Sequence, residues 1–553
     1  MKKLYLFLLF SLSIIINLQG QVFDWAKREG LYGYDYGYGI VTDNFGNVYT
    51  AGKYEENANF SGTIIPCSGN HDIYLAKYSP GGALSWIRTG GGTLGDYAQA
   101  MCTDGTNYVY VAGEIEGTGL ITFPGSSITL NCVGDNDVFL LKYDLAGNLL
   151  WARSEGTWYN EKAQGVTLDN DGNVYITGKF TDTTRFGGTL IPGAGFKDMF
   201  IAKYDTNGNL LWMKHEGGPG REEGISVKCD AVGNAYVCGM YSDGAVFGGN
   251  TYSTVLTPSG HYYDAYLAKY SPNGTLLWLK SFGGDYDDVA WSLTADNNGK
   301  IYIAGEFNAY ATFDSFYLTS MGKADIFVAA LDPVTENFQW ISQAGGPLLD
   351  RVRGIGTDGT NLFITGQYGG TAAFGLNSIT AADSSDVFIA GMGNSGNFNW
   401  AMTVSGPADS FEPLGYESGN GVTALPSGEV YATGAILDGG VFGSTAYPKY
   451  SQTDIFIAKI LQVGTNIPEV NGAGDFLIYP NPGNGIFSLD VRKLSDQKLE
   501  VTIQNCWGQI VDKRMNNPNS VLKLDLSAQQ KGFYFVEIKT QDERIYREKI
   551  ILQ

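Results

Sequence analysis

Histidine and basic residues are scarce in this chain of 553 residues, which has 3 histidines and 36 Lys/Arg against 57 Asp/Glu. The net charge of −21 argues against nucleic acid as a partner, because phosphate binding needs a cationic surface. His71, His215 and His261 lie far apart, and neither an H-E-x-x-H nor a G-x-S-x-G motif occurs. The sequence therefore supports neither a metalloprotease nor an α/β-hydrolase.

Long apolar runs are also missing, except at the start of the chain. Lys2 and Lys3 precede a largely apolar stretch over residues 4–18, and Gly20 is a small residue suited to cleavage. This layout predicts a secretory signal peptide over residues 1–20. A membrane anchor is the alternative, but the run is short and polar sequence follows at once. No later stretch approaches the ~18 apolar residues of a membrane span, so we expect none in the mature chain.

Cysteine is limited to six residues, and their spacing resembles no zinc site. Cys67 and Cys132 lie in comparable loops, whereas Cys102, Cys229 and Cys238 fall inside strand patterns. We favour buried thiols, and a Cys67–Cys132 disulfide is the alternative.

Glycine and aromatic residues are abundant, with 75 glycines and 13% aromatics, and both favour strands joined by tight turns. A tryptophan recurs every 60 to 66 residues, at Trp25, Trp86, Trp151, Trp212, Trp278, Trp340 and Trp400. This regularity indicates seven repeats of one structural unit.

Each repeat contains four strand patterns. The second is GNVYTAG at residues 46–52, the third is DIYLAKY at residues 72–78, and a longer, variable loop separates them. A strand of small residues precedes this pair, and a Leu-Leu-Trp strand follows it. Four antiparallel strands repeated seven times predict an all-β fold, a seven-bladed β-propeller over residues 21–461. A solenoid of hairpins is the alternative, and it would need capping repeats.

The two ends of the repeat array favour the closed ring. The last repeat stops at Ile460 without a tryptophan strand, and the first tryptophan strand, residues 23–28, precedes any complete repeat. Joining the two completes the seventh blade and removes free sheet edges. The repeats resemble the bacterial β-propeller repeat called SBBP. That resemblance implies a secreted or surface protein and supplies no common mechanism.

A different composition begins after the repeats. Residues 462–474, rich in glycine and asparagine, indicate a linker, and residues 475–553 alternate in several short strands. The pattern predicts a small immunoglobulin-like β-sandwich.

This tail resembles the type A sorting domain of the Bacteroidota type IX secretion system. The matching positions are Pro480, Asn481, Pro482, Gly485, Gly508, Gly532, Tyr534 and Lys549. The resemblance implies recognition of residues 475–553 by the outer-membrane translocon and a sortase, and a protein that is secreted or held on the outer cell surface after passing the periplasm. An ordinary immunoglobulin-like module is the alternative.

An acidic residue follows six of the seven tryptophans by ten positions: Asp35, Asp96, Glu161, Glu222, Asp288 and Asp350, with Ser410 at the seventh. In a propeller these positions lie where one blade crosses to the innermost strand of the next. A ring of carboxylates at one channel mouth would attract a basic partner or a metal cation such as calcium. The alternative, which we favour, is that each carboxylate caps backbone N–H groups of its own loop.

Two further patterns bear on chemistry. An EF-hand loop beginning at Asp169 would need a glutamate at its twelfth position, which is Phe180, so we expect a hairpin turn there. Tyr32, Tyr34, Tyr36 and Tyr38 cluster ahead of the first inner strand, where amphipathic rings suit sugar or protein recognition or interblade packing.

Two functions of different classes follow from these patterns. The first is a non-catalytic secreted or surface protein that binds an extracellular glycan or protein. The second is a secreted hydrolase or lyase acting on polysaccharide, for which carboxylate pairs such as Asp287-Asp288 would serve.

Overall fold

The structure of the chain is a computed structural model that describes residues 20–254, 263–382, 384–406, 417–437, 439–447, 452–463, 477–480, 483–491, 498–505, 510–516, 521–529, 531–539 and 545–552. Strands and turns make up these ranges, which contain no helix, so the all-β prediction is confirmed. The chain divides into two compact units, Gln21–Gln462 and a second that includes Val463–Gln553.

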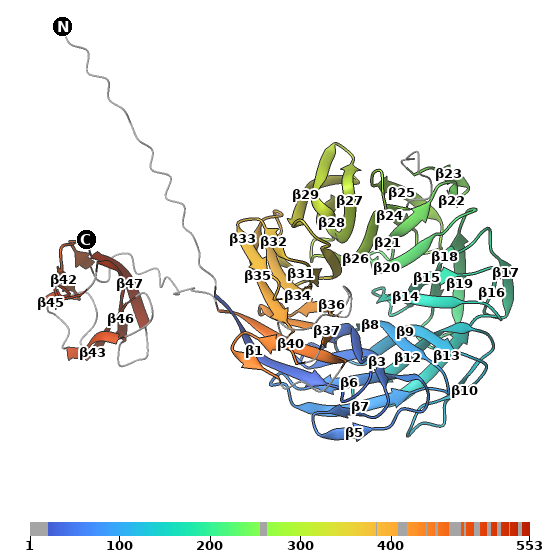
Figure 1. Cartoon of the computed structure of the whole chain (residues 1–553), viewed down its shortest axis with the longest axis horizontal. Helices are drawn as coiled ribbons and strands as arrows, with labels where there is room; N and C mark the ends of the chain where they lie inside the picture. Colours follow the sequence, from blue (N-terminus) through green and yellow to red (C-terminus); the bar gives the residue numbers. More distant parts are fainter. Residues whose placement is uncertain are drawn as a thin grey trace, which may run out of the picture. The chain divides into compact units, whose positions relative to one another are not determined.

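The larger unit is built from antiparallel sheets with one shared strand order (Figure 1). The first three are β2 (Tyr36–Thr42), β3 (Val48–Glu55), β6 (His71–Tyr78), β7 (Leu84–Gly90); β8 (Asp96–Thr103), β9 (Tyr108–Glu116), β12 (Asn136–Asp144), β13 (Leu149–Glu155); and β14 (Glu161–Leu168), β15 (Val174–Phe180), β18 (Asp198–Tyr204), β19 (Leu210–Glu216). The next three are β20 (Glu223–Cys229), β21 (Ala235–Ser242), β24 (Tyr263–Tyr270), β25 (Leu276–Phe282); β26 (Val289–Ala295), β27 (Ile301–Phe313), β28 (Phe316–Asp332), β29 (Asn337–Gly345); and β30 (Arg351–Thr357), β31 (Asn361–Tyr368), β34 (Asp386–Gly393), β35 (Phe398–Ser405).

One further sheet joins the two ends of this unit. It contains β36 (Ser418–Ala424), β37 (Glu429–Leu437), β40 (Thr453–Val463) and β1 (Gly20–Glu29), in that order. The N-terminal strand therefore pairs with the last long strand, as the ends of the repeat array predicted. Strands β2, β8, β14, β20, β26, β30 and β36, hereafter the inner strands, contact one another in sequence, and β36 contacts β2, so the inner strands form a closed ring.

The variable loop expected between the second and third strands is instead a short hairpin. These hairpins are β4 (Ala58–Phe60) with β5 (Thr63–Ile65), β10 (Gly119–Thr122) with β11 (Thr129–Cys132), β16 (Thr183–Phe186) with β17 (Thr189–Pro192), β22 (Ala245–Phe247) with β23 (Asn250–Tyr252), the tip of β27–β28, β32 (Thr371–Phe374) with β33 (Asn377–Thr380), and β38 (Val441–Phe442) with β39 (Thr445–Ala446). A buried phenylalanine ends the first strand of each hairpin, or directly follows it in the case of β10, and β32 and β38 extend the sheet of the preceding repeat.

Five of the seven recurring tryptophans join neighbouring repeats through a hydrogen bond. Trp86 Nε1 donates a 3.3 Å hydrogen bond to the Leu145 carbonyl in the next repeat, and the indole lies over Gly147 of the same turn. Trp25, Trp151, Trp212 and Trp340 make equivalent bonds. The turn glycine is needed because its φ is +86° at Gly147 and because a Cβ there would lie 3.0 Å from the Trp86 ring.

Replacing Gly147 by alanine tests whether its positive φ or its contact with the Trp86 ring makes glycine necessary. Gly147→Ala should lower the free energy of unfolding by more than Gly188→Ala, measured by urea denaturation of the mature chain. Both sites have positive φ, which costs about 1–2 kcal/mol for alanine, but a Cβ at Gly188 meets nothing within 4 Å. Equal losses would show that the indole contact contributes nothing.

The second unit contains two sheets around one core. They are β41 (Leu477–Tyr479), β42 (Ile486–Asp490), β45 (Val521–Asp525), and β44 (Ile510–Asn516), β43 (Leu499–Asn505), β46 (Gly532–Lys539), β47 (Ile545–Leu552). Phe487, Leu524, Val501, Val536 and Ile550 from the two sheets share a buried cluster. Strands β41 and β44 were not anticipated from the sequence.

Candidate functional site

Every inner strand carries a β-bulge at the same position. In β2 the pairing with β3 shifts between Gly37 and Gly39, which leaves Tyr38 out of the ladder. The equivalent residues of the other inner strands are Gln99, Gln164, Ile225, Trp291, Arg353 and Asn420. A bulge bends its strand and redirects the extra side chain. All seven of these bulged residues line one cavity.

The bulge explains the glycine that ends the GNVYTAG pattern. A Cβ at Gly52 would lie 1.9 Å from the Tyr36 carbonyl oxygen, and at Gly113 it would lie 1.8 Å from that of Tyr97. The corresponding glycines of the other repeats face the inner strand equally closely. The bulged strand approaches its neighbour at this point, so only a residue without a Cβ fits. The repeated glycine and the bulge are thus one feature.

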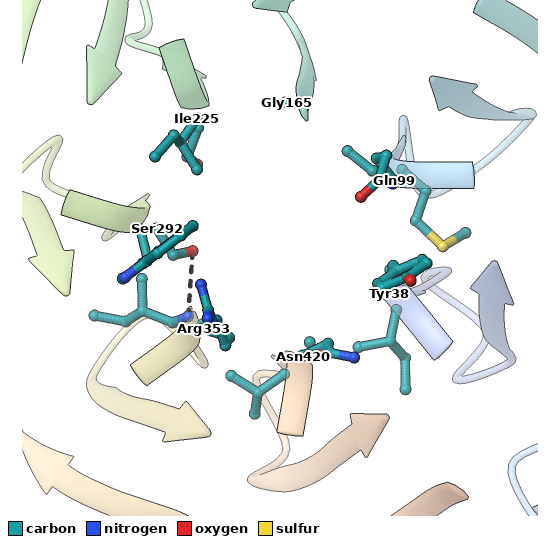
Figure 2. A pocket seen from close by; sticks show the side chains of 18 of the residues that line it. Tyr38, Gln99, Gly165, Ile225, Ser292, Arg353 and Asn420 are labelled. Atoms are coloured by element: carbon teal, nitrogen blue, oxygen red, sulfur yellow. Dashed lines mark hydrogen bonds between the residues drawn. The ribbon is translucent and has the colours of Figure 1, made fainter. Parts of the chain in front are cut away.

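The cavity lies on the axis of the ring of inner strands. It has a volume of about 620 Å³ and is lined by residues of all seven inner strands. Figure 2 shows Tyr38, Gln99, Ile225, Arg353 and Asn420 placed around its open centre. The bulged residues differ in chemistry from repeat to repeat, although the flanking positions stay small or aliphatic. The cavity is thus formed at a position where the repeats differ from one another.

Several contacts order the cavity wall. The Arg353 guanidinium lies 3.8 Å from the centre of the Trp291 ring. Tyr36 and Tyr38 stack with ring centroids 5.8 Å apart. Asn420 Nδ2 donates a 2.9 Å hydrogen bond to the Gly37 carbonyl. Opposite parts of the wall therefore offer aromatic rings, amides and a guanidinium.

Charged side chains at the ends of the inner strands and of their neighbours are paired with one another. The pairs are Lys53–Glu55 at 3.0 Å, Lys162–Glu114 at 2.9 Å, Lys179–Glu223 at 2.7 Å and Arg351–Glu306 at 2.9 Å. These residues precede or follow the bulges and the recurring glycines in sequence. Because these charged side chains pair with one another, we expect the residues that line the cavity to determine what is bound.

The six predicted acidic residues lie one per repeat, at or just before the start of an inner strand, and all are buried. Asp96 Oδ2 accepts a 2.8 Å hydrogen bond from Gly92 N, and its Oδ1 accepts one of 3.2 Å from Glu116 N. Asp35, Glu222, Asp288 and Asp350 also accept backbone N–H bonds, and Glu161 accepts a hydrogen bond from the Thr157 hydroxyl. In the part of the chain that the structure describes, no three acidic, histidine or cysteine residues group so as to hold a metal. Most of these carboxylates thus accept backbone N–H bonds, as the capping alternative expects, and the shared calcium site stays a prediction.

A second carboxylate faces each of these residues. Burial, and then the neighbouring Asp137, raise the pKa of Glu161 to about 8, and burial raises the pKa of Asp137 to about 6. Burial likewise raises the pKa of Asp96, Glu222 and Asp350 to about 7, with Asp72, Asp198 and Asp325 as the respective acidic neighbours. Burial is thus the main cause of the raised pKa values, and in Asp96, Glu161, Glu222 and Asp350 the neighbouring carboxylate adds to it.

The seventh acidic position is Glu417, which the fixed spacing from tryptophan missed. Glu417 Oε1 accepts a 3.0 Å hydrogen bond from Leu437 N, as Asp35 Oδ1 accepts one of 2.8 Å from Glu55 N. Ser410, predicted at this place, lies outside the described residues. The sequence between Trp400 and Glu417 is seven residues longer than in the first repeats, which moved the acidic residue out of register.

Other predicted residues are placed as follows. Asp169 closes a hairpin turn, with Oδ1 accepting bonds from Asp171 N and Asn173 N, as expected. Cys67, Cys102, Cys132, Cys229 and Cys238 are free thiols, so the Cys67–Cys132 disulfide is absent. Of the sorting positions, Pro480 and Tyr534 are described, Gly485 has a φ of +108°, and Gly532 begins β46. Lys549 lies in β47, whereas Asn481, Pro482 and Gly508 fall outside the described residues.

Two families match parts of the chain. Residues 477–553 match the secretion system C-terminal sorting domain, and residues 24–53 match the beta-propeller repeat named SBBP. The protein is thus a β-propeller exported by the type IX secretion system to the cell surface or the medium. Among the described residues, no helix is long and apolar enough to cross a membrane.

Curated relatives share only segments with this chain. An uncharacterized WD repeat-containing protein of Acanthamoeba polyphaga mimivirus is 27% identical over 33% of this chain and 16% of its own length. The regulatory protein FlaEY of Caulobacter vibrioides is 26% identical over 50% of this chain and 29% of its own. The chain therefore matches less than a third of either relative.

The solved structures that match the chain are distant in sequence and have low TM-scores. A puromycin hydrolase is 10% identical, with a TM-score of 0.36 over 83% of this chain and 58% of that one. The cobalt-substituted Synechocystis ACO is 11% identical, with a TM-score of 0.34 over 80% and 93%.

Proposed function

We propose that this protein is a non-catalytic binding protein whose axial cavity takes an extracellular glycan. Residues 1–20 act as a removed signal peptide, and residues 21–461 form a seven-bladed propeller closed by β1 and β40. Residues 462–474 form a linker, and residues 475–553 form an immunoglobulin-like sandwich read by the translocon and sortase. The observation that carries the proposal is the set of seven bulged residues, which differ from one another in an otherwise repetitive wall and point into one cavity.

The chemistry of the wall supports binding over cleavage. The residues lining the cavity include no Asp, Glu, His or Cys. Glycoside hydrolysis generally uses a pair of carboxyl groups on either side of the scissile bond. Tyr38 and Trp291 instead supply amphipathic rings, and Gln99, Gln164 and Asn420 supply amides that match sugar hydroxyls.

A glycan array combined with a reducing-sugar assay tests this function on the mature chain. We expect retention of at least one glycan without release of reducing ends. Tyr38→Ala should weaken that retention about tenfold, because it removes an aromatic contact surface. Tyr317→Ala, on an outer hairpin where the side chain is 62% exposed, is the matched control and should bind normally. Released sugar would establish the polysaccharide hydrolase or lyase instead, and no retention of any glycan would refute the proposal.

A further inference from the structure

The charge of the axial cavity is opposite to that of the chain. The chain as a whole carries −21, yet the cavity is lined by three cationic residues, Lys162, Lys228 and Arg353, and by no carboxylate. Lys162 is neutralised by Glu114 at 2.9 Å. Neither Lys228 nor Arg353 makes an ion pair or side-chain hydrogen bond with any residue in the described ranges. Two cations without an ion pair in the described residues therefore lie at the cavity wall.

Arg353 is the more constrained of the two. It is the bulged residue of β30, and its guanidinium stacks on Trp291 at 3.8 Å. Arg351, two residues earlier, forms an ion pair with the nearby Glu306 at 2.9 Å. The Glu306 carboxylate is therefore already paired with Arg351. Burial is the largest influence on Arg353, and it lowers the pKa of this side chain. The side chain is partly buried, and Glu306 attracts it without forming an ion pair with it, so an anion from outside would supply the direct partner that the guanidinium lacks.

Neutral groups around Arg353 match the rest of a sugar. Gln99, Gln164 and Asn420 bring amides to the same cavity, and the buried Gln164 Oε1 has no hydrogen-bond partner. Tyr38 and Trp291 provide ring faces on the same wall. A volume of about 620 Å³ falls within the range of ordinary small-ligand sites.

We infer that the axial cavity selects a saccharide that carries an anionic group, with its carboxylate or sulfate on the Arg353 guanidinium and its hydroxyls on the amides. The inference rests on the proposed function and adds to it the class of ligand. A planar guanidinium binds either anion in a bidentate manner, which a neutral sugar does not reproduce. The overall negative charge of the protein gives no general attraction for such ligands, so binding must come from the cavity.

The experiment is calorimetry of the mature chain with three probes: a galacturonate disaccharide, the neutral galactose disaccharide and a sulfated galactose disaccharide. We expect one of the acidic probes to bind at least about tenfold more tightly than the neutral one. The preference should decline as salt is raised, because the attraction is electrostatic. The probe that binds identifies carboxylate or sulfate as the anion.

Charge variants locate the anion. Arg353→Gln should abolish the preference, Arg353→Lys should keep part of it, and the exposed Arg185→Gln is the control that should leave it intact. If Arg353→Gln does not fold, Lys228→Gln should reduce the preference in its place. Equal affinity for neutral and acidic probes would overturn the inference and leave the binding function standing. No binding of these probes or of any array glycan would overturn the proposed function itself.

Discussion

Removal of residues 475–553 should stop the protein from reaching the cell surface or the medium. Residues 477–553 match the sorting domain and have a buried core of their own, whereas the remaining chain keeps its own sheets and clusters. We therefore expect the truncated protein to accumulate in the periplasm in a folded, protease-resistant form. Immunoblots of periplasmic, surface and medium fractions measure this result directly.

A single substitution in the tail serves as the control for this deletion. Met515→Ala changes a side chain that is 61% exposed on β44, so the sorting domain should fold and export should be normal. Appearance of the truncated protein in the medium would show that export does not depend on the tail. Degradation of the truncated protein in every fraction would instead mean that the propeller needs the tail to fold.

The sequence was sufficient to predict most strands because their patterns recur. The tryptophan spacing, the GNVYTAG pattern and the DIYLAKY pattern each correspond to a strand of the repeat. The hairpin between the second and third strands was missed because its sequence varies. Its constant feature, a buried phenylalanine before a tight turn such as Phe186-Gly187-Gly188-Thr189, was available but short.

The cavity could not be predicted, since a bulge depends on how two strands pair. No single side-chain type is common to all seven bulged residues, so no sequence pattern marks them as one set. The indirect signal was the repeated glycine facing the inner strand, as Gly52 faces the Tyr36 carbonyl. The acidic residues were visible in the sequence, but their pairing with an aspartate of the third strand requires the fold.

These carboxyl pairs give the propeller an unusual response to pH. Asp137 Oδ1 and Glu161 Oε2 lack hydrogen-bond partners, and a Cβ at Gly156 would lie 2.4 Å from the first and 3.1 Å from the second. The two oxygens therefore face the same small space. Both residues are buried, so ionisation of both groups is unfavourable, and the pKa values of about 6 and about 8 reflect this.

A raised pKa in the folded state means that folding is favoured while the group is protonated. That stability is fully present below the unfolded pKa of about 4 and is lost as pH rises through the folded values of 6 to 8. Asp96, Glu222 and Asp350, with pKa values of about 7, act in the same direction. Turn residues such as Asp104 and Asp169 have a lowered pKa. Their contribution to stability is present above the unfolded pKa of about 4 and is lost as the pH falls below it.

We therefore expect the free energy of unfolding to fall by on the order of 3 kcal/mol or more between pH 5 and pH 9. Urea denaturation of the mature chain across this range measures the change. A flat profile, or higher stability at pH 9 than at pH 5, would contradict the buried carboxyl pairs.

Asp137→Asn should make the chain more stable at pH 8 by about 1–3 kcal/mol and reduce the dependence on pH. Asparagine Oδ1 can still accept the 3.0 Å bond from Val133 N, which Asp137 Oδ2 accepts in the native chain. Its amide N–H then points to Glu161 Oε2 and replaces a carboxylate with a donor, so Glu161 ionises at lower pH. Asp135→Asn, at an exposed position two residues away, is the matched control and should leave the pH profile of stability unchanged.

A loss of stability at pH 8 in Asp137→Asn, or a pH profile as steep as that of the native chain, would show that the carboxyl groups of Asp137 and Glu161 do not repel each other. The amide N–H of the Asp137→Asn variant can stabilise the fold only if Glu161 Oε2 lacks a partner in the native chain. If the variant gives no gain, the hydrogen bonds to loop N–H groups are sufficient to explain why an acidic residue recurs in each repeat.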